Sequence, residues 1–364
     1  MRIVHAVYIP RLSGAEVLVS LLAPRHQEAG HTTMVLSLRP SQPSFDGILS
    51  GLRKCGVVVK TPKHDLTRWQ RIGFLWAELL DFEPDVVFAH SVIPSAYLRT
   101  IAAFTRIRIV TVLHDASQDD YRDWRFRLAE YLLPAPRAVV AVAARGLQHY
   151  RERFRGVSGE VIANAIDLNA LKSALEKRTT YRARVLCLED GETLFVSVGR
   201  FSRQKNQDVL ISAFERLPDS VLKKCRLLII GISEDAGYEA YLRMKAKILG
   251  ERVSVVANRA DSMELLACAD VFCMPSLQEG FSLAFLEGLA LEVRVLASEI
   301  DSFAFAARWP GVTLIPATAI DLWAKHFKGA LFEGGRRYAR PVEKYDPAGV
   351  ARTYERVAME VASQ

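Results

Sequence analysis

A short segment after an expected buried strand carries three positive charges. Arg200, Arg203 and Lys205 follow the apolar run 193–198 and precede an expected helix at residues 207–216. Cations this close together repel one another unless an anion binds among them. An arginine can clamp an oxyanion with two hydrogen bonds, whereas a lysine supplies a mobile point charge. The segment therefore favours a diphosphate ligand, and the alternative is an ordinary basic surface loop.

Two glutamates flank the start of a second expected helix. The apolar run 270–274 ends at Pro275, and the helix that follows contains Glu287 and has Ser282 as its N-cap. A carboxylate on a buried helix is costly unless something pairs with it, whereas the N-terminus of a helix attracts anions. Because Glu279 precedes that end of the helix and Glu287 follows it, the segment favours a ligand with both phosphate and hydroxyl groups, such as a sugar nucleotide. The alternative is a strand–helix unit with two incidental glutamates.

These motifs resemble those of a known family. The segment from Pro275 to Glu287, with seven residues between its two glutamates, is similar to the signature of the retaining glycosyltransferases of family 4. The likeness extends to residues 198–200 and 205–206 and covers most of the chain. The resemblance implies the GT-B fold, an α/β architecture in which two facing Rossmann-like domains with parallel sheets leave an interdomain cleft.

The resemblance also implies a role for individual positions. Arg200 and Lys205 bind the pyrophosphate and stabilise it as it leaves. Glu279 holds hydroxyl groups of the sugar, and Glu287 holds those of the ribose. The expected catalytic residues are Glu279, Arg200, Lys205 and His114. The expected donor-binding residues are Gly14, Glu16, Gly199, Arg200, Lys205, Asn258, Arg259, Gly280, Phe281, Ser282 and Glu287, with Asn258 and Arg259 on the side of the base.

The length of the chain favours two domains. Its 364 residues exceed the size at which one hydrophobic core keeps growing. By the resemblance, residues 1–166 form an acceptor-binding Rossmann-like domain and residues 167–342 form the nucleotide-sugar-binding domain. Residues 343–364 are then a helix that packs back on the N-terminal domain.

The first expected domain brings two histidines to one edge of a parallel sheet. His90 lies near the end of an expected strand at residues 85–91, and His114 follows another at residues 107–113. Open α/β sheets bind ligands at the carboxyl ends of their strands. The resemblance gives His114 a role in contacting the sugar or stabilising the site. His90 and Asp115 are assigned to the acceptor side, and simple packing is the alternative for His90.

The loop after the first strand is a further candidate. It is expected to connect the strand at residues 3–9 to a helix at residues 17–29 and to contain Gly14 and Glu16. The resemblance places this loop near the donor phosphates and the acceptor, whereas the alternative is an ordinary turn. Residues 41–50 are polar and contain proline, which predicts another loop.

Charge and composition limit the classes of molecule that the protein can bind. The net charge of +7 fits acidic substrates, and no run of Lys and Arg is dense enough to indicate nucleic acid. The five cysteines are scattered without a Cys-x-x-Cys pair, which predicts reduced thiols and a cytoplasmic protein. No apolar run approaches the ~20 residues that span a bilayer. Any membrane association would then be peripheral, at the inner face, and the sequence does not fix the oligomeric state.

We therefore expect a retaining, hexosyltransferase-type enzyme that moves a sugar from a nucleotide diphosphate sugar, first of all a UDP-sugar, to a hydroxyl group. The acceptor is a saccharide, a natural product or a lipid-linked glycan. The chain has no Asp-x-Asp motif and its cationic segment can replace the charge of a metal, so neither a divalent metal nor another cofactor is expected. Asp301 and Ser302 replace the glycine pair that often touches the transferred sugar in the family, which leaves the sugar open. The alternatives are a nucleotide-sugar epimerase on the same fold and a non-catalytic nucleotide-sugar-binding protein.

Overall fold

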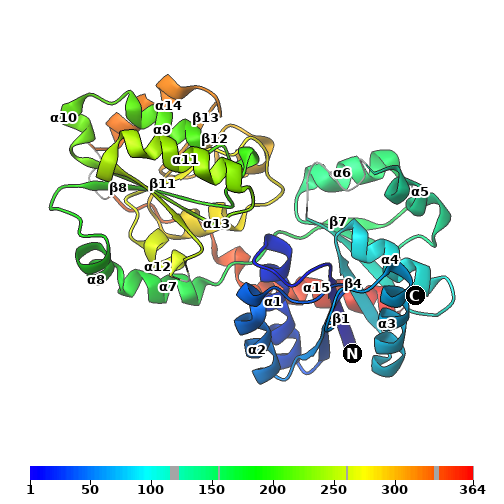
Figure 1. The fold of residues 1–364 in the computed structure, drawn as a ribbon. Helices are drawn as coiled ribbons and strands as arrows, with labels where there is room; N and C mark the ends of the chain where they lie inside the picture. The colour runs from blue at the N-terminus through cyan, green and yellow to red at the C-terminus, as the bar shows by residue number, and fades with distance from the viewer. Residues whose placement is uncertain (115–122, 155, 260, 332–335, 364) are drawn as a thin grey trace. The chain divides into compact units, whose positions relative to one another are not determined.

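The computed structural model of the protein describes residues 1–114, 123–154, 156–259, 261–331 and 336–363. Contacts divide the chain into two compact units: unit 1 is Met1–Ile166 with Glu343–Gln364, and unit 2 is Asp167–Val342. Each unit is an α/β structure with its own parallel sheet (Figure 1). None of the described helices combines the length and the apolar character that crossing a bilayer requires.

The sheet of unit 1 reverses its strand order between β1 and β4. Over the described residues the order is β3-β2-β1-β4-β5-β6-β7, and all the pairs are parallel. The central strands are buried along their whole length, as in sheets covered by helices on both faces. The carboxyl ends of β1 and β4 therefore form a switch point, where open α/β sheets bind ligands. The strands are β1 (Arg2–Val7), β2 (Thr32–Ser37), β3 (Val58–Lys60), β4 (Val86–His90), β5 (Ile109–Leu113), β6 (Ala138–Ala141) and β7 (Gly159–Val161).

The C-terminal helix α15 (Pro347–Ala362) belongs to unit 1. Its Tyr354 and Val357 share a buried cluster with Leu18 of α1 and Phe88 of β4, and α15 lies beside α1 in Figure 1. The expectation of a loop at residues 41–50 is wrong, because η1 and α2 occupy residues 43–54. The other helices are α1 (Gly14–Glu28), η1 (Pro43–Phe45), α2 (Asp46–Lys54), α3 (Arg68–Phe82), α4 (Val92–Ala102), α5 (Trp124–Leu132), α6 (Ala144–Arg153) and η7 (Glu343–Tyr345).

The sheet of unit 2 has a comparable reversal between β8 and β11. Its order over the described residues is β10-β9-β8-β11-β12-β13, again with parallel pairs only. The loops that follow β8 and β11 therefore meet at the switch point of this sheet. The strands are β8 (Thr193–Val198), β9 (Cys225–Gly231), β10 (Val253–Ala257), β11 (Val271–Met274), β12 (Arg294–Ser298) and β13 (Val312–Ile315).

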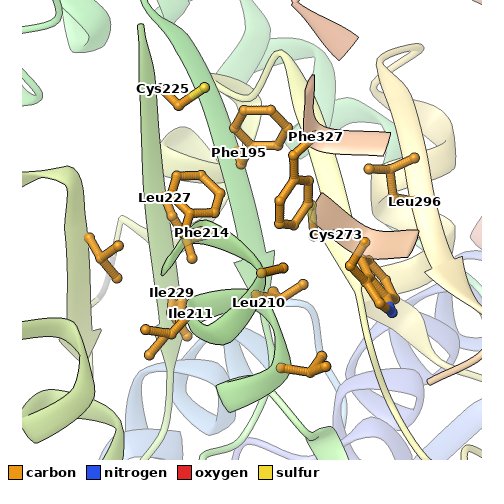
Figure 2. Close-up of a cluster of buried hydrophobic side chains, with 14 of the residues drawn as sticks. Phe195, Leu210, Ile211, Phe214, Cys225, Leu227, Ile229, Cys273, Leu296 and Phe327 are labelled. Atoms are coloured by element: carbon orange, nitrogen blue, oxygen red, sulfur yellow. The ribbon is translucent and has the colours of Figure 1, made fainter. Parts of the chain in front are cut away.

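An aromatic cluster fixes two helices on the sheet of unit 2 (Figure 2). Phe195 of β8, Phe214 of α9 and Phe327 of α14 are fully buried and pack edge to face, with ring centroids 4.9 to 5.5 Å apart. Such contacts stabilise beyond the area they bury. The helices are α7 (Leu168–Glu176), α8 (Arg178–Thr180), η3 (Tyr181–Val185), η4 (Arg203–Lys205), α9 (Asp208–Glu215), α10 (Asp219–Leu222), α11 (Ala236–Ile248), η5 (Gly250–Arg252), α12 (Ser262–Ala267), α13 (Leu283–Ala290), η6 (Asp301–Ala306) and α14 (Ile320–Ala330).

Candidate active site

The cationic segment, residues 200–205, lies at the carboxyl end of β8. The backbone N–H of Gly199 donates to the carbonyl of Ile230 at 3.0 Å, which keeps the start of the segment on the edge of the sheet. A Cβ at position 199 would lie 3.4 Å from Cδ of Lys205. The stem of Lys205 therefore packs at ordinary contact distance from this position.

Lys205 and Glu279 join the two sides of the switch point. Nζ of Lys205 lies 2.5 Å from Oε1 of Glu279, and the two side chains are only 12% and 8% exposed. Gln204 ties the same two loops together, because its carbonyl accepts from Leu277 N–H and its side chain donates to the carbonyl of Gln278, both at 2.8 Å. The sequence-predicted cation and carboxylate are thus brought into direct contact.

Protein carboxylates neutralise the cationic segment. Besides the Lys205 pair, Arg200 forms a half-exposed ion pair with Glu234, and the exposed Arg203 lies 5.7 Å from the ring centroid of Tyr238. Two protein carboxylates therefore offset part of the charge of this segment. An exposed ion pair is worth only about 0–1 kcal/mol, so the Arg200 pair can open to an incoming oxyanion at little cost.

Ser302 supports the backbone of Glu279. Its hydroxyl donates to the carbonyl of Glu279 from η6, which begins at Asp301. This is the position at which the sequence departs from the glycine pair of the resembling family. The serine at this position could have predicted the contact, because its hydroxyl can donate a hydrogen bond and a glycine has no side chain to do so.

The N-terminus of α13 is the expected anion-binding end of a helix. Ser282 is the N-cap as predicted, and its Oγ accepts from the N–H of Phe285 at 3.4 Å. The helix begins at Leu283, so Gly280 and Phe281 lie in the loop before it. Within the described residues, the N–H groups of Leu283 and Ala284 have no acceptor. The first turn of α13 therefore offers donors to a ligand.

Glu287 has no ion-pair or hydrogen-bond partner for its carboxylate among the described residues. It is half-buried on α13, and burial raises the pKa of its carboxyl group to about 7. The neighbouring Gly288 explains how close this helix lies to the sheet, because a Cβ there would lie 2.2 Å from the ring of Phe272 in β11. A desolvated carboxylate that lacks a protein partner can accept hydrogen bonds from hydroxyl groups of a ligand.

Asn258 and Arg259 lie at the carboxyl end of β10. Asn258 adopts a left-handed backbone with φ of 56°, a conformation that glycine adopts freely and asparagine tolerates better than most residues. Its N–H donates to the carbonyl of Gly231 at 2.8 Å. The exposed Arg259 pairs with Asp261, at 2.6 Å from Nε to Oδ1. The first of the two residues therefore shapes the sheet edge, and the second extends into solvent.

In unit 1, Gly14 and Glu16 lie in the first turn of α1 and not in a loop. The helix begins three residues earlier than expected, because Ser13 takes the N-cap position and Glu16 the third position of the helix. Ser13-x-x-Glu16 is the sequence pattern of a capping box, although the Ser13 side chain makes no hydrogen bond to the backbone of this helix. The hydroxyl of Ser13 donates to the nearly buried carboxylate of Glu16.

His90 and His114 are brought together at the carboxyl ends of β4 and β5. Nδ1 of His90 lies 2.9 Å from Nε2 of His114. Two histidines that the sequence analysis missed, His5 of β1 and His26 of α1, continue the contact inward. Asp115 lies outside the described residues. Within the part of the chain that is described, no group of three or more His, Cys, Asp or Glu side chains is arranged to hold a metal ion.

Two family models match the sequence. The model described as Glycosyltransferase Family 4 matches residues 12–170, and the model described as Glycosyl transferases group 1 matches residues 182–331. Together they cover most of the chain.

Curated relatives are also glycosyltransferases. The chain is 31% identical over 150 residues to the UDP-Gal:alpha-D-GlcNAc-diphosphoundecaprenol alpha-1,3-galactosyltransferase of Escherichia coli, which covers 39% of this chain and 36% of the relative. It is 23% identical over 298 residues to the lipopolysaccharide core biosynthesis mannosyltransferase LpsB of Rhizobium meliloti, 78% of each chain. For several other curated relatives the chain spans about half of their length or less.

Solved structures share the fold over the whole chain. HepE of Anabaena in complex with UDP-glucose superposes with a TM-score of 0.75 at 16% identity, covering 100% of this chain and 98% of that one. Sucrose-phosphate synthase of Thermosynechococcus elongatus has a TM-score of 0.74 at 16% identity, covering 100% and 99%. At this identity the likeness shows the fold, the GT-B architecture with a parallel sheet in each of two domains.

Proposed function

Because this chain belongs to the family 4-like glycosyltransferases, we propose that it transfers a sugar from a nucleotide diphosphate sugar to a hydroxyl group of an acceptor. The observation that carries the proposal is the contact between Lys205 and Glu279 across the β8–β11 switch point, beside the first turn of α13. Cation, carboxylate and free N–H groups together match a ligand that has a diphosphate next to a sugar.

We assign the diphosphate to Arg200 and Lys205 of the cationic segment and to the N-terminus of α13. Among the described residues Arg200 pairs with Glu234 in a half-exposed ion pair, so it can turn to a phosphate oxygen with little loss. Lys205 is nearly buried and stays near Glu279. Both cations would stabilise the negative charge that grows on the diphosphate as it leaves, which is usually the largest contribution to catalysis of this kind.

The two glutamates are assigned to hydroxyl groups. Lys205 and Ser302 hold Glu279, whose second carboxylate oxygen can accept from a hydroxyl of the transferred sugar. Glu287 lacks a protein partner among the described residues, which supports its assignment to the ribose. In unit 1, we assign the edge with Gly14, Glu16, His90 and His114 to the substrate as well.

We further propose that the reaction retains the configuration at the anomeric carbon and needs no divalent metal. The cationic segment supplies the positive charge that a metal would otherwise bring to the diphosphate. Retention would follow if the leaving phosphate oxygen takes the proton of the acceptor on the face from which it departs. A UDP-sugar is the donor we test first, since one relative is named for UDP-Gal and one structural neighbour holds UDP-glucose.

The acceptor that fits best is a saccharide, either free or attached to a lipid carrier. The relatives support this choice, because their names specify a diphosphoundecaprenol-linked GlcNAc and a lipopolysaccharide core. A lipid-linked acceptor would bring the protein to a membrane surface without requiring a helix that spans it.

A panel of UDP-, GDP-, ADP- and TDP-sugars in a thermal-shift assay identifies the donor, because ligand binding raises the melting temperature. Transfer is then measured with saccharide and lipid-linked acceptors, with and without EDTA, and the anomeric configuration of the product is read by NMR. Product that forms without any acceptor would indicate an epimerase. Tight binding without turnover on any acceptor would indicate a binding protein, and an inverted product would refute retention.

A further inference from the structure

A row of four histidines runs through unit 1 from α1 to the carboxyl end of β5. Nε2 of His26 lies 3.2 Å from the carbonyl oxygen of Ala351 in α15, and Nδ1 of His26 lies 3.1 Å from Nε2 of His5. Nδ1 of His5 lies 3.0 Å from Nε2 of His90, and Nδ1 of His90 lies 2.9 Å from Nε2 of His114. Every ring uses one nitrogen toward each neighbour. We call these four residues the histidine row.

Three of the four rings are buried and none carries a charge near neutral pH. Burial lowers the pKa of His26 and of His114 to about 4 and holds those of His5 and His90 well below the ordinary value. A neutral imidazole has one N–H, so it donates from one nitrogen and accepts at the other. Each contact in the row therefore needs a defined tautomer on both sides.

The carbonyl at the inner end sets the direction of the whole row. An oxygen of a peptide bond can only accept, so Nε2 of His26 carries the hydrogen and its Nδ1 accepts from Nε2–H of His5. The same reasoning passes outward through His5 and His90, so that Nε2 of His114 donates to Nδ1 of His90. Nδ1 of His114 therefore carries no hydrogen and can act only as a hydrogen-bond acceptor.

Nδ1 of His114 is the outer end of the histidine row. Nδ1 of His114 is buried and has no hydrogen-bond partner among the described residues. A buried acceptor without a donor is costly, so natural proteins keep few of them unless a ligand or water supplies the missing hydrogen bond. In this protein it lies at the carboxyl edge of the sheet, where ligands of α/β proteins bind.

We propose that His26, His5 and His90 are positioning residues that fix the tautomer of His114, so that its Nδ1 is presented as a hydrogen-bond acceptor to a hydroxyl group of the substrate. The fixed tautomer follows from the contacts alone, whereas the hydroxyl as its recipient rests on the proposed function. The carbonyl of Ala351 in α15 thus determines the tautomer of His114 at the sheet edge through the histidine row, without transfer of a proton.

His5 offers a matched pair of variants. Phenylalanine at position 5 keeps a ring between His26 and Phe88, which stacks on His5 at 5.4 Å between ring centroids, but neither accepts nor donates. The Nε2–H of His90 then loses its acceptor, which favours moving this hydrogen to Nδ1. His90 would then donate to Nε2 of His114, and the hydrogen of His114 would move to Nδ1. Glutamine at position 5 can accept from His90 and donate to His26, so His5→Gln should keep the original direction.

The test is ¹⁵N NMR of protein labelled at histidine, which reports which ring nitrogen carries the hydrogen, with the exposed His64→Gln as a control for assignment. We expect Nε2–H on His114 in the wild type and in His5→Gln, and Nδ1–H in His5→Phe. In transfer assays kcat/KM should fall about tenfold in His5→Phe, as the loss of one hydrogen bond of 1–1.5 kcal/mol predicts, and should recover in His5→Gln.

Two outcomes would overturn the proposal. One is a wild-type His114 that carries its hydrogen on Nδ1, and the other is a His114 whose tautomer is the same in His5→Phe as in the wild type. Failure of the proposed function looks different, since no donor and acceptor would then give product while the NMR result stands. Equal melting temperatures of the two His5 variants would show that a change in kcat/KM does not come from unfolding.

Discussion

Nζ of Lys205 lies 2.5 Å from Oε1 of Glu279, which links the loop after β8 to the loop after β11 at the switch point of the sheet. Neither side chain is more than 12% exposed, so each is the main counter-charge of the other. The pair sets the resting state of the site, and the same lysine is the cation that we assign to the leaving diphosphate.

Lys205→Met should lower kcat by about a hundredfold, the effect expected when one group that stabilises transition-state charge is removed. The matched control is Arg203→Met, which removes the same charge from an exposed side chain of the same loop and should change kcat less than twofold, within the usual scatter for surface substitutions. Lys205→Met also leaves the carboxylate of Glu279 buried without its ion-pair partner, which should lower the melting temperature. The double variant with Glu279→Gln should therefore regain the melting temperature but not the turnover. A Lys205→Met enzyme with wild-type kcat would refute the assignment.

The two loops of this site could be predicted because their signals are local. Apolar runs ending in glycine or proline mark β8 and β11, and the charged residues follow within a few positions. Ser282 caps α13 as its sequence neighbourhood predicts. The parallel sheets follow from strands alternating with helices, which fixes the edge at which these loops meet.

The partners of the charged groups could not be predicted, because they come from remote parts of the chain. Glu234 is 34 positions from Arg200, and His5 is 85 positions from His90. Such pairs depend on strand order and side-chain direction, which no local pattern contains. The helix α2 was missed for a different reason: its buried side is reduced to Leu49 and Leu52, too few apolar residues to outweigh the polar and proline signals before it.

Acid should destabilise unit 1 through the histidine row. The folded-state pKa of His26 and His114 is about 4, below the ordinary value of about 6.5. Their stabilising contribution is complete above pH 6.5 and is lost as the pH falls toward 4, because only the unfolded chain binds the protons. Each histidine should contribute a loss of about 1.4 kcal/mol per pH unit in that window.

Urea unfolding at pH 7.5, 6.0 and 5.0 measures this loss. His26→Gln should reduce the pH dependence by one histidine, since its amide can still donate to the carbonyl of Ala351. The exposed His64→Gln should leave the dependence as in the wild type. A His26→Gln variant with an unchanged dependence on pH would mean that His26 is already protonated in the folded protein.

Glu287→Gln should stabilise the folded protein at high pH and weaken the binding of the donor. The folded-state pKa of Glu287 is raised to about 7, above the ordinary value of about 4.3. The contribution of Glu287 to stability is therefore complete below pH 4 and is lost as the pH rises through 7. Removing the charge should raise the free energy of unfolding by about 1–3 kcal/mol at pH 8 and leave it unchanged at pH 4.

The control for this prediction is Glu215→Gln, a change at an exposed position of α9. It should alter the free energy of unfolding at neither pH. If Glu287 holds the ribose, the KM for the donor should also rise in Glu287→Gln, so that stability and donor binding change in opposite directions. A variant with neither effect would contradict both the burial and the role of this carboxylate.

Gly288→Ala should displace α13 from the sheet. A Cβ at this position would lie 2.2 Å from a ring atom of Phe272, so the helix or the ring must move. Overpacking of this kind destabilises by about 1–3 kcal/mol. Because the same helix carries Glu287 and the N–H groups assigned to the diphosphate, the KM for the donor should rise as well.

The matched control is Gly329→Ala in α14, where a Cβ would meet no atom within 4 Å. There the better helix propensity of alanine should raise the melting temperature slightly. Melting curves and donor titrations of the two variants give the answer, and a Gly288→Ala protein that melts and binds like Gly329→Ala would show that the contact between α13 and β11 is looser than the structure has it.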